Sequence, residues 1–167
     1  MKPLILVSSK TGNTRIIAHG VADEVAGAVY MNAADLPEDL SGFGPVGLFF
    51  WCDRGMAPED MKAAAKRLCG KEVACFATMG GCPQEERALA WMQKTSEELV
   101  AAGEGNVLKG TFLCQGRIDP ELIERMNKMF GNGKPDPARD ARRKAAETHP
   151  DRLDVLAAVE AWRKCFG

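Results

Sequence analysis

Short apolar runs alternate with longer segments of helical periodicity along most of this chain. Leu4–Val7 and Val46–Trp51 are almost continuously apolar, which is typical of strands covered on both faces. Ala28–Met31, Lys71–Thr78 and Val107–Gln115 have the length and the content of β-branched or aromatic residues that favour further strands. The pattern therefore predicts five strands.

Segments with helical periodicity lie between these runs. In Thr14–Ala26 the apolar residues recur every three or four positions, and Gly27 follows as a helix stop. Further helices are predicted after Pro58, after Pro83 and at the C-terminus of the chain. The helical residues predicted to face the core are Ile16, Ile17, Val21, Val25, Met61, Ala65, Leu68, Leu89, Met92, Leu99, Val100, Leu153, Leu156, Val159 and Trp162.

Strands that alternate with helices predict an α/β fold, with a doubly wound parallel sheet and helices on both faces. At 167 residues, the chain is predicted to be a single domain over 1–167. Residues 119–148 are predicted to form a helical insertion before the last helix, with a glycine- and proline-rich break at Gly131–Pro137 and a basic stretch behind it. His149-Pro150-Asp151 is predicted to cap the last helix.

The first strand runs into a hydroxyl-rich loop, Ser8–Thr14. Its hydroxyls, on Ser9, Thr11 and Thr14, offer O–H donors. Gly12 lets the backbone approach a ligand closely. Because the loop leads directly into a helix, a phosphate there would also meet free backbone N–H groups and the positive end of the helix dipole. The loop predicts a phosphate-monoester site; the alternative is a polar turn whose own side chain caps the helix.

Two other loops are expected to meet the first one. In a doubly wound sheet, ligands bind beyond the carboxyl ends of the strands, where the strand order reverses. Trp51–Ala57 and Thr78–Cys82 follow the third and fourth strands, and they offer an aromatic residue, small residues and backbone amides that suit a flat heterocycle. Gly42–Gly47 matches the dinucleotide pattern GxGxxG, but we reject that match because the pattern precedes a strand instead of linking a strand to a helix.

These loops resemble those of a known family. Ser9–Thr14 is similar to the phosphate loop of flavodoxins. Trp51–Gly55, Thr78–Pro83, Phe112–Asp119 and His149-Pro150 resemble a bacterial flavodoxin-like subfamily with some members associated with bilirubin reductases. The resemblance covers nearly the whole chain. It implies a flavodoxin-like fold with the strand order 2-1-3-4-5, for which flavodoxin is itself the standard example, and flavin mononucleotide (FMN) as the cofactor.

The resemblance also implies a set of FMN-binding residues. The first loop would hold the phosphate, Trp51 would lie against or beside the isoalloxazine, Asp53–Gly55 would surround its edge, and Thr78–Cys82 would contact its pyrimidine end. Arg54 is hypothesised to lie near the N1/O2 edge and to favour the anionic reduced form. Cys82 departs from the family, whose members often carry an aromatic residue there. The full set is Ser9, Lys10, Thr11, Gly12, Asn13, Thr14, Trp51, Asp53, Arg54, Gly55, Thr78, Met79, Gly80, Gly81 and Cys82.

Composition and charge limit the classes of partner and the cellular setting that we expect. The formal net charge of −1 predicts no general affinity for nucleic acid or anionic membranes. With no recognisable signal peptide and no apolar run long enough to span a bilayer, we expect a cytoplasmic protein. The six cysteines show neither a CxxC motif nor metal-ligand spacing with histidine, which favours free thiols and predicts no metal site. Arg139, Arg142, Arg143 and Lys144 form a local charge excess that we interpret as a solvated helix face.

Three functions follow from these features. The first is an FMN-binding electron-transfer protein with a dedicated redox partner protein such as a reductase, because the chain lacks the strongly acidic face that steers generic carriers. Residues 119–148 are then the predicted docking surface. The second is an NAD(P)H-dependent FMN or quinone reductase, although the sequence has no feature for a nicotinamide site. The third is a phosphate-binding module with no redox role; Lys10-Thr11 resembles the end of a P-loop, but the preceding glycines are missing. No catalytic nucleophile or base is predicted.

Overall fold

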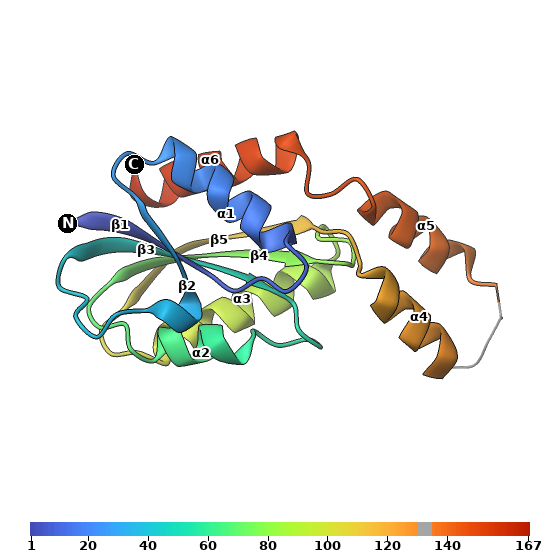
Figure 1. The fold of residues 1–167 in the computed structure, drawn as a ribbon, viewed down its shortest axis with the longest axis horizontal. Coiled ribbons are helices and arrows are strands. Elements are labelled where there is room, and N and C mark those ends of the chain that lie inside the picture. The colour runs from blue at the N-terminus through green and yellow to red at the C-terminus, as the bar shows by residue number, and fades with distance from the viewer. Residues whose placement is uncertain (130–134) are drawn as a thin grey trace.

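A five-stranded parallel sheet forms the centre of the molecule (Figure 1), in a computed structural model that describes residues 1–129 and 135–167. The strands lie in the order β2-β1-β3-β4-β5. The predicted doubly wound α/β fold and its strand order are therefore confirmed. The strands are β1 (Lys2–Val7), β2 (Val29–Asn32), β3 (Phe43–Trp51), β4 (Glu72–Met79) and β5 (Val107–Gln115).

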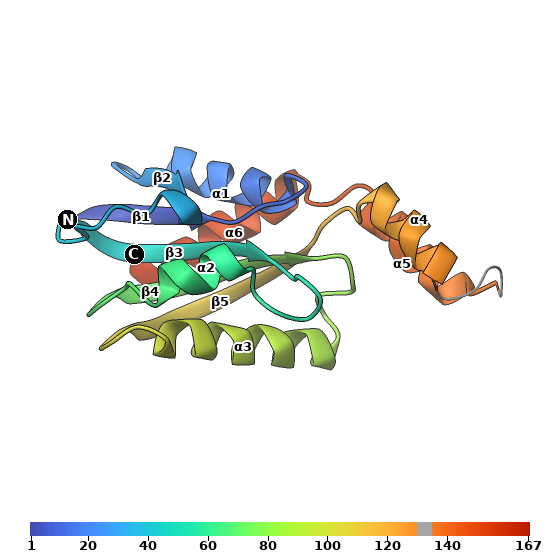
Figure 2. The ribbon, with the colours of Figure 1, turned by 60° about the horizontal axis from the view of Figure 1, so that its bottom comes forward.

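Helices cover both faces of this sheet (Figures 1 and 2). One face carries α1 (Asn13–Glu24) and α6 (Arg152–Phe166), and the other carries α2 (Glu59–Ala65) and α3 (Glu86–Ala101). A short 3-10 helix, η1 (Ala33–Asp35), lies against α2. Among the described residues, no helix combines the length and the apolar character needed to cross a membrane.

The core consists of two layers because successive strand residues point to opposite faces of the sheet. In β1, Leu4 and Leu6 belong to the layer under α2 and α3, whereas Ile5 and Val7 belong to the layer under α1 and α6. Both faces of the sheet are thus covered, which explains the continuous apolar runs of the sequence. Gly47 of β3 leaves room for the ring of Trp162, since a Cβ at this position would lie 2.6 Å from a ring carbon.

Several residues predicted to face the core are exposed instead. The side chains of Leu89, Leu153 and Leu156 are 54%, 72% and 52% exposed, and Ile16 is also largely exposed. The apolar stripe that periodicity defines on these helices is wider than the face that fits against the sheet. In α6, for example, Ala158, Val159 and Trp162 are buried, while the leucines near its start lie outside the buried stripe.

The third strand begins earlier than its apolar run indicates. β3 begins at Phe43 and not at Val46. Gly44 and Gly47 of the GxGxxG pattern therefore lie inside a strand, where they form no turn between a strand and a helix. The structure agrees with the rejection of a dinucleotide fingerprint at Gly42–Gly47.

A pair of helices projects beyond the sheet at the carboxyl ends of the strands (Figures 1 and 2). α4 (Pro120–Met129) follows β5, and α5 (Pro137–Ala146) leads into α6. These helices fall within the predicted insertion over 119–148; part of the predicted break at Gly131–Pro137 lies outside the described residues. None of the ten residues of α4 is buried. α4 therefore contributes no residue to either layer of the core.

Candidate functional site

A cavity of about 480 Å³ lies at the carboxyl ends of β1, β3 and β4. Loops after these strands form one side of it, and the insertion and its base form the other side. The side formed by the loops is lined by Ser9, Lys10, Thr11, Asn13, Thr14, Trp51, Cys52, Thr78, Met79, Gly80 and Gly81. Ten of the fifteen residues predicted to bind FMN are among them, whereas Gly12, Asp53, Arg54, Gly55 and Cys82 do not line the cavity.

The hydroxyl-rich loop wraps the N-terminus of α1. Thr14 and Thr78 are both buried, and their Oγ1 atoms lie 2.8 Å apart, which joins the start of α1 to the end of β4. Ser9 Oγ accepts a hydrogen bond from the backbone N–H of Gly12 at 3.2 Å. Ser8, just before them, donates to Asp60 of α2 at 2.7 Å. The loop is therefore fixed to the sheet and to helices on both of its faces.

The start of α1 fits a phosphate. Its N-cap residue is Gly12, in a left-handed conformation with φ of 99°, and no side chain caps the helix. The alternative of a polar turn whose own side chain caps the helix is therefore wrong. The first backbone N–H groups of a helix have no partner within the helix, so here they remain available to an anion. A Cβ on Gly12 would meet no atom within 4 Å, so the glycine serves the backbone conformation and not close packing.

Asn13 has a structural partner. Its side-chain Nδ2 donates to the carbonyl oxygen of Arg117 at 2.8 Å. A Cβ on Gly116 would lie 2.7 Å from that same Nδ2, so glycine is needed for the approach. The backbone N–H of Arg117 donates in turn to the carbonyl of His149 at 2.9 Å. Asn13 thus holds the base of the insertion, where the chain leaves the body and where it returns.

Trp51 and Gly80 line the part of the cavity where a flat heterocycle would fit. Trp51 stands at the end of β3, and Lys10 Nζ lies 5.8 Å from the centroid of its ring. Gly80 allows Ile118 to approach, since a Cβ there would lie 2.6 Å from Ile118 Cγ1. Burial raises the pKa of the neighbouring Cys52 thiol, which keeps it protonated and unreactive as a nucleophile.

The segment Asp53–Met56 folds back as a tight hairpin turn. Asp53 and Met56 exchange two backbone hydrogen bonds of 2.8 and 2.9 Å, and φ is positive at both Arg54 (52°) and Gly55 (78°). Two central residues with positive φ define a type I′ turn. The carbonyl of Gly55 accepts a hydrogen bond from Trp91 Nε1 at 2.9 Å, so α3 holds the turn in place. Arg54 and Gly55 are exposed at its tip.

Cys82 lies in the loop after β4. Its thiol donates to Gln84 Oε1 at 3.1 Å. The pair is local to the start of α3, and Cys82 is absent from the lining of the cavity in the described residues. The structure therefore gives no ring-stacking contact at the position where relatives often carry an aromatic residue.

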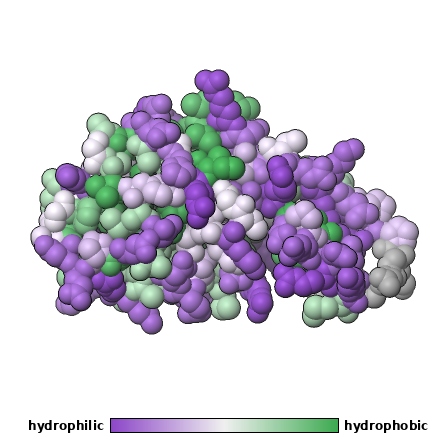
Figure 3. Space-filling view, viewed as in Figure 1, coloured by the Kyte–Doolittle hydropathy of each residue, from purple (hydrophilic) through white to green (hydrophobic). Residues whose placement is uncertain are grey.

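The insertion contributes lining residues that the sequence did not predict. On α5, Arg139, Arg142 and Arg143 line the cavity. Arg142 is exposed and the other two are partly exposed, so the predicted solvated helix face also forms one wall of the cavity. Leu122 and Met126 of α4 line it as well. In both helices the lining positions follow the spacing of neighbours on one helical face, which is the signal that was present in the sequence. Polar and charged side chains cover most of the remaining surface of the two helices in Figure 3.

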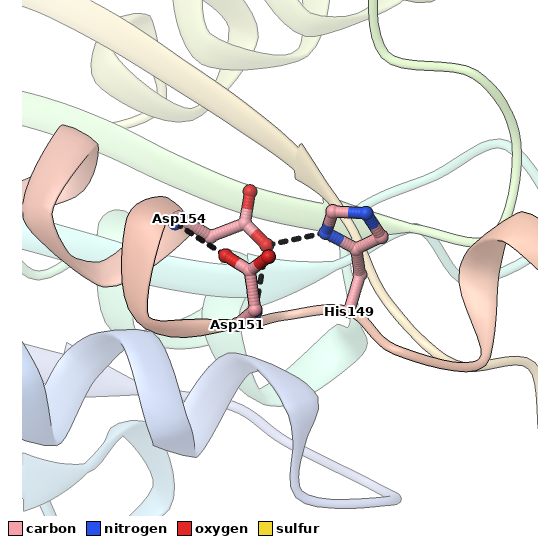
Figure 4. A group of neighbouring side chains, drawn as sticks. All are labelled: His149, Asp151 and Asp154. Atoms are coloured by element: carbon pink, nitrogen blue, oxygen red, sulfur yellow. Dashed lines mark hydrogen bonds and ion pairs between the residues drawn. The ribbon is translucent and has the colours of Figure 1, made fainter.

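The start of α6 carries a cluster of His149, Asp151 and Asp154 (Figure 4). Asp151 accepts from the backbone N–H of Asp154 at 3.0 Å, and Asp154 Oδ2 accepts from the backbone N–H of Asp151 at 2.8 Å. This is a capping box, so the predicted cap is confirmed. His149 Nδ1 lies 2.6 Å from Asp154 Oδ2, and this hydrogen bond raises the pKa of His149. The contacts of this cluster therefore cap the N-terminus of α6.

Comparison with known proteins places the chain in a family. The Flavodoxin domain family matches residues 4–163, so the chain belongs to that family. The flavodoxin-like domain-containing protein BilS of Clostridium symbiosum (strain WAL-14163) is 31% identical over 182 residues, which cover 94% of this chain and 92% of that protein. BilS of Clostridioides difficile (strain CD3) is 27% identical over 168 residues, which cover 95% and 92% of the two chains.

Solved structures agree on the fold. The flavoprotein in complex with FMN from Lactobacillus acidophilus NCFM matches with a TM-score of 0.53 and 17% identity over 74% of this chain and 97% of that chain. At this identity the similarity concerns the fold. Family membership supports FMN, the cofactor predicted from the sequence, as the cofactor of this chain.

Proposed function

We propose that this protein is an FMN-binding electron-transfer protein that exchanges electrons with a dedicated redox partner protein. One observation carries the proposal: the uncapped, hydroxyl-ringed N-terminus of α1 opens into a cavity with Trp51 and Gly80 in its walls. The isoalloxazine ring supplies the redox chemistry when FMN is bound, and the protein supplies binding, orientation and electrostatics.

The phosphate end of the site is assigned to the first loop. Hydroxyls of Ser9, Thr11 and Thr14 and the first N–H groups of α1 would donate to the phosphate oxygens. Lys10 adds a positive charge beside them. Because Thr14 and Thr78 are buried and joined to each other, this end of the site is already formed and binding requires little ordering of the chain.

The ring end of the site is assigned to Trp51 and to the backbone of Thr78–Gly81. These residues would exclude water from one side of the ring and donate to its polar edge. Asp53, Arg54, Gly55 and Cys82 remain proposed contacts; because they lie outside the cavity lining, the ring would have to extend past the cavity to reach them. The hairpin turn at Asp53–Met56 then stands beside the exposed edge of the ring.

The polar groups of the cavity favour electron transfer over acid–base catalysis. Among the described residues that line it, Asp119 is the one carboxylate and histidine is absent. Cys52 stays protonated. Residues 119–148 are proposed as the docking surface for the partner. Their described helices, α4 and α5, rise from the same edge of the sheet, so a partner that contacts either helix would be brought close to the ring. We further propose a reducing cytoplasm as the setting, which matches six free cysteines.

Spectroscopy tests the cofactor first. The purified protein is expected to show the near-ultraviolet and blue absorption bands of an oxidised flavin, and the apoprotein is expected to bind one FMN tightly. A colourless protein that FMN cannot saturate would contradict the proposal and favour the phosphate-binding module. Riboflavin, which lacks the phosphate, is the matched control ligand and should bind much more weakly if the first loop holds the phosphate.

A second function, that of an NAD(P)H-dependent FMN or quinone reductase, is favoured by one observation. Arginines of the insertion line the cavity beside the proposed ring site, and guanidinium groups suit the phosphates of a dinucleotide. Anaerobic mixing of the FMN-loaded protein with NADPH separates the two. Direct bleaching of the flavin bands supports the reductase, and unchanged bands together with reduction through a partner protein support the carrier.

A further inference from the structure

The side of α4 that faces the cavity combines apolar and cationic groups. Leu122, Arg125 and Met126 line the cavity, and their spacing of three and four residues places them on one face of the helix. The side chains of Leu122 and Met126 are 42% and 40% exposed. Exposed apolar side chains inside a cavity gain free energy when a ligand with apolar surface covers them.

The side of α5 that faces the same cavity is cationic. Arg139, Arg142 and Arg143 line it with the same helical spacing. Arg143 Nη1 donates to Asn127 Oδ1 of α4 at 3.3 Å, which joins the two helices, and Arg139 pairs with Asp140 at 3.4 Å. Within the described residues, the side chains of Arg125 and Arg142 form no hydrogen bond or ion pair. Two guanidinium groups at this cavity are therefore available to an external anion.

The cavity carries an excess of positive charge. Six cationic side chains line it against one carboxylate, that of Asp119, although the net charge of the whole chain is −1. The phosphate of FMN is assigned to α1 and Lys10, on the side of the cavity that the loops form. This assignment leaves four arginines of α4 and α5 at the cavity, namely Arg125, Arg139, Arg142 and Arg143. Arg139 pairs with Asp140, whereas the side chains of Arg125 and Arg142 have no ion-pair partner among the described residues.

We infer that the inner face of the insertion binds a small organic anion, with an apolar frame and at least two carboxylate or phosphate groups, next to the proposed FMN site. Guanidinium groups bind both anions through two parallel hydrogen bonds. A concave site with apolar walls and a few directed charges is typical of small ligands and differs from a flat protein-docking surface. The inference rests on the proposed function in one respect, the place given to FMN.

Binding to the FMN-loaded protein tests the inference. The probe is naphthalene-2,6-dicarboxylate, and its neutral counterpart is naphthalene-2,6-dimethanol. We expect the dicarboxylate to bind at least tenfold more tightly than the diol in equilibrium dialysis, and to weaken as salt is raised. NADP⁺ is titrated in parallel, because tighter binding of NADP⁺ identifies phosphate as the anionic group and tighter binding of the dicarboxylate identifies carboxylate. Either result supports an anion site.

Variants separate this site from the FMN site. Arg125→Gln combined with Arg142→Gln is expected to weaken the tighter-binding anion at least tenfold while the affinity of the apoprotein for FMN stays unchanged. Lys128→Gln combined with Lys144→Gln is the matched control, with the same charge change on the same helices at positions outside the cavity lining. Equal affinities in the two double variants, equal binding of diol and dicarboxylate, or loss of FMN binding in the arginine variant would overturn the inference. Failure of the wild-type apoprotein to bind FMN would instead contradict the proposed function.

Discussion

The two sides of the cavity differ in how they are built. On the side of the loops, Thr14 and Thr78 are buried, hydrogen-bonded to each other and attached to the central sheet. On the side of the insertion, α4 buries none of its residues, and four of the six lining side chains of α4 and α5 are arginines. The first side is fixed before any ligand arrives, which suits a resident cofactor. The second is adaptable, which suits a ligand that must come and go.

The same contrast holds for stability. The sheet and its four covering helices contain the two core layers, whereas the insertion is connected to them through a narrow base. At that base, Arg117 donates to the carbonyl of His149. Changes on the side of the loops should therefore affect FMN affinity and stability together, and changes in the insertion should affect neither.

The largest effect is expected for Thr14→Val. The substitution keeps the shape of the side chain but removes a donor to the phosphate and leaves the buried Thr78 hydroxyl without its partner. Hydrogen bonds to charged groups contribute about 1.5–3 kcal/mol, so FMN affinity should fall about tenfold to a hundredfold. The free energy of unfolding should fall by about 1 kcal/mol. Isothermal titration with FMN and urea unfolding of the apoprotein measure the two quantities.

Two variants control this result. Thr14→Ser keeps the hydroxyl and should retain most of the FMN affinity. Thr95→Val changes another buried threonine, in α3 and away from the FMN site, and should leave FMN affinity unchanged. If Thr14→Val binds FMN as the wild type does, the assignment of the phosphate to the first loop is wrong.

The next effect is expected at the start of α6 and concerns stability alone. Asp154→Ala removes one half of the capping box and the partner of His149, which should lower the free energy of unfolding by about 1–2 kcal/mol. FMN affinity should not change, because none of the three residues of the cluster lines the cavity. Thermal unfolding and FMN titration together check this pair of outcomes, and a loss of FMN affinity would show that the insertion base and the cofactor site are coupled.

The contribution of His149 should depend on pH. Its hydrogen bond to Asp154 raises its pKa above the ordinary value of 6.5 in the folded protein. The stabilisation is therefore fully present below about pH 6.5 and is lost as the pH rises through the folded-state pKa. The difference in unfolding free energy between wild type and His149→Gln should be largest near about pH 5 and decline above neutrality. A difference that is constant across this range would contradict the assigned partner.

Gly55→Ala is expected to have a still smaller effect. The glycine has a φ of 78°, in the left-handed region where a Cβ costs about 1 kcal/mol, although no atom lies within 4 Å of the added group. The free energy of unfolding should fall by about that amount. Gly42→Ala, at a position with open space and an ordinary φ, is the matched control and should change stability little.

The smallest effect is expected for removal of the insertion. Because the backbones of Arg117 and His149 are hydrogen-bonded, a short Gly-Asn-Gly linker in place of residues 119–147 can join them. Ala146 is the one buried residue among the described residues that are removed, so the free energy of unfolding should change little, and FMN affinity should persist. Reduction through the partner protein should be impaired. A variant that cannot bind FMN would show that the two sides of the cavity are one unit.

The sequence predicted the fold well because burial on both faces leaves a clear mark. The apolar runs of β1 and β3 are continuous because both strands lie inside the sheet with neighbours on either side, whereas the edge strand β2 has no fully buried residue. Boundaries shifted by a few residues, as at Phe43, because strand ends are set by pairing with neighbours and not by apolar content. Leu153 and Leu156 were misassigned because periodicity gives the direction of an apolar stripe but not the width of the surface that covers it.

Residues that the sequence proposes for the site line the cavity where they follow directly from a strand end, and do not line it where the chain turns back. Ser9 and Trp51 are placed by the strands before them, so topology brings them together. Asp53–Gly55 follow a strand too, but a type I′ turn directs their tip away from the cavity lining. Arg139 and Arg142 are recognisable in the sequence as a charged helix face, but only the placement of α5 beside the loops shows that this face lines a cavity.

The hydrogen bond between the Thr14 and Thr78 hydroxyls uses only one of their two protons. Each hydroxyl carries one proton, and the 2.8 Å contact between the two oxygen atoms uses one of them. The second proton points away from the pair, and no acceptor for it is found among the described residues. An acceptor without protons of its own, such as a phosphate dianion, completes this arrangement, whereas an ammonium group adds donors where an acceptor is needed. The pair of hydroxyls thus favours an anionic ligand over a cationic one.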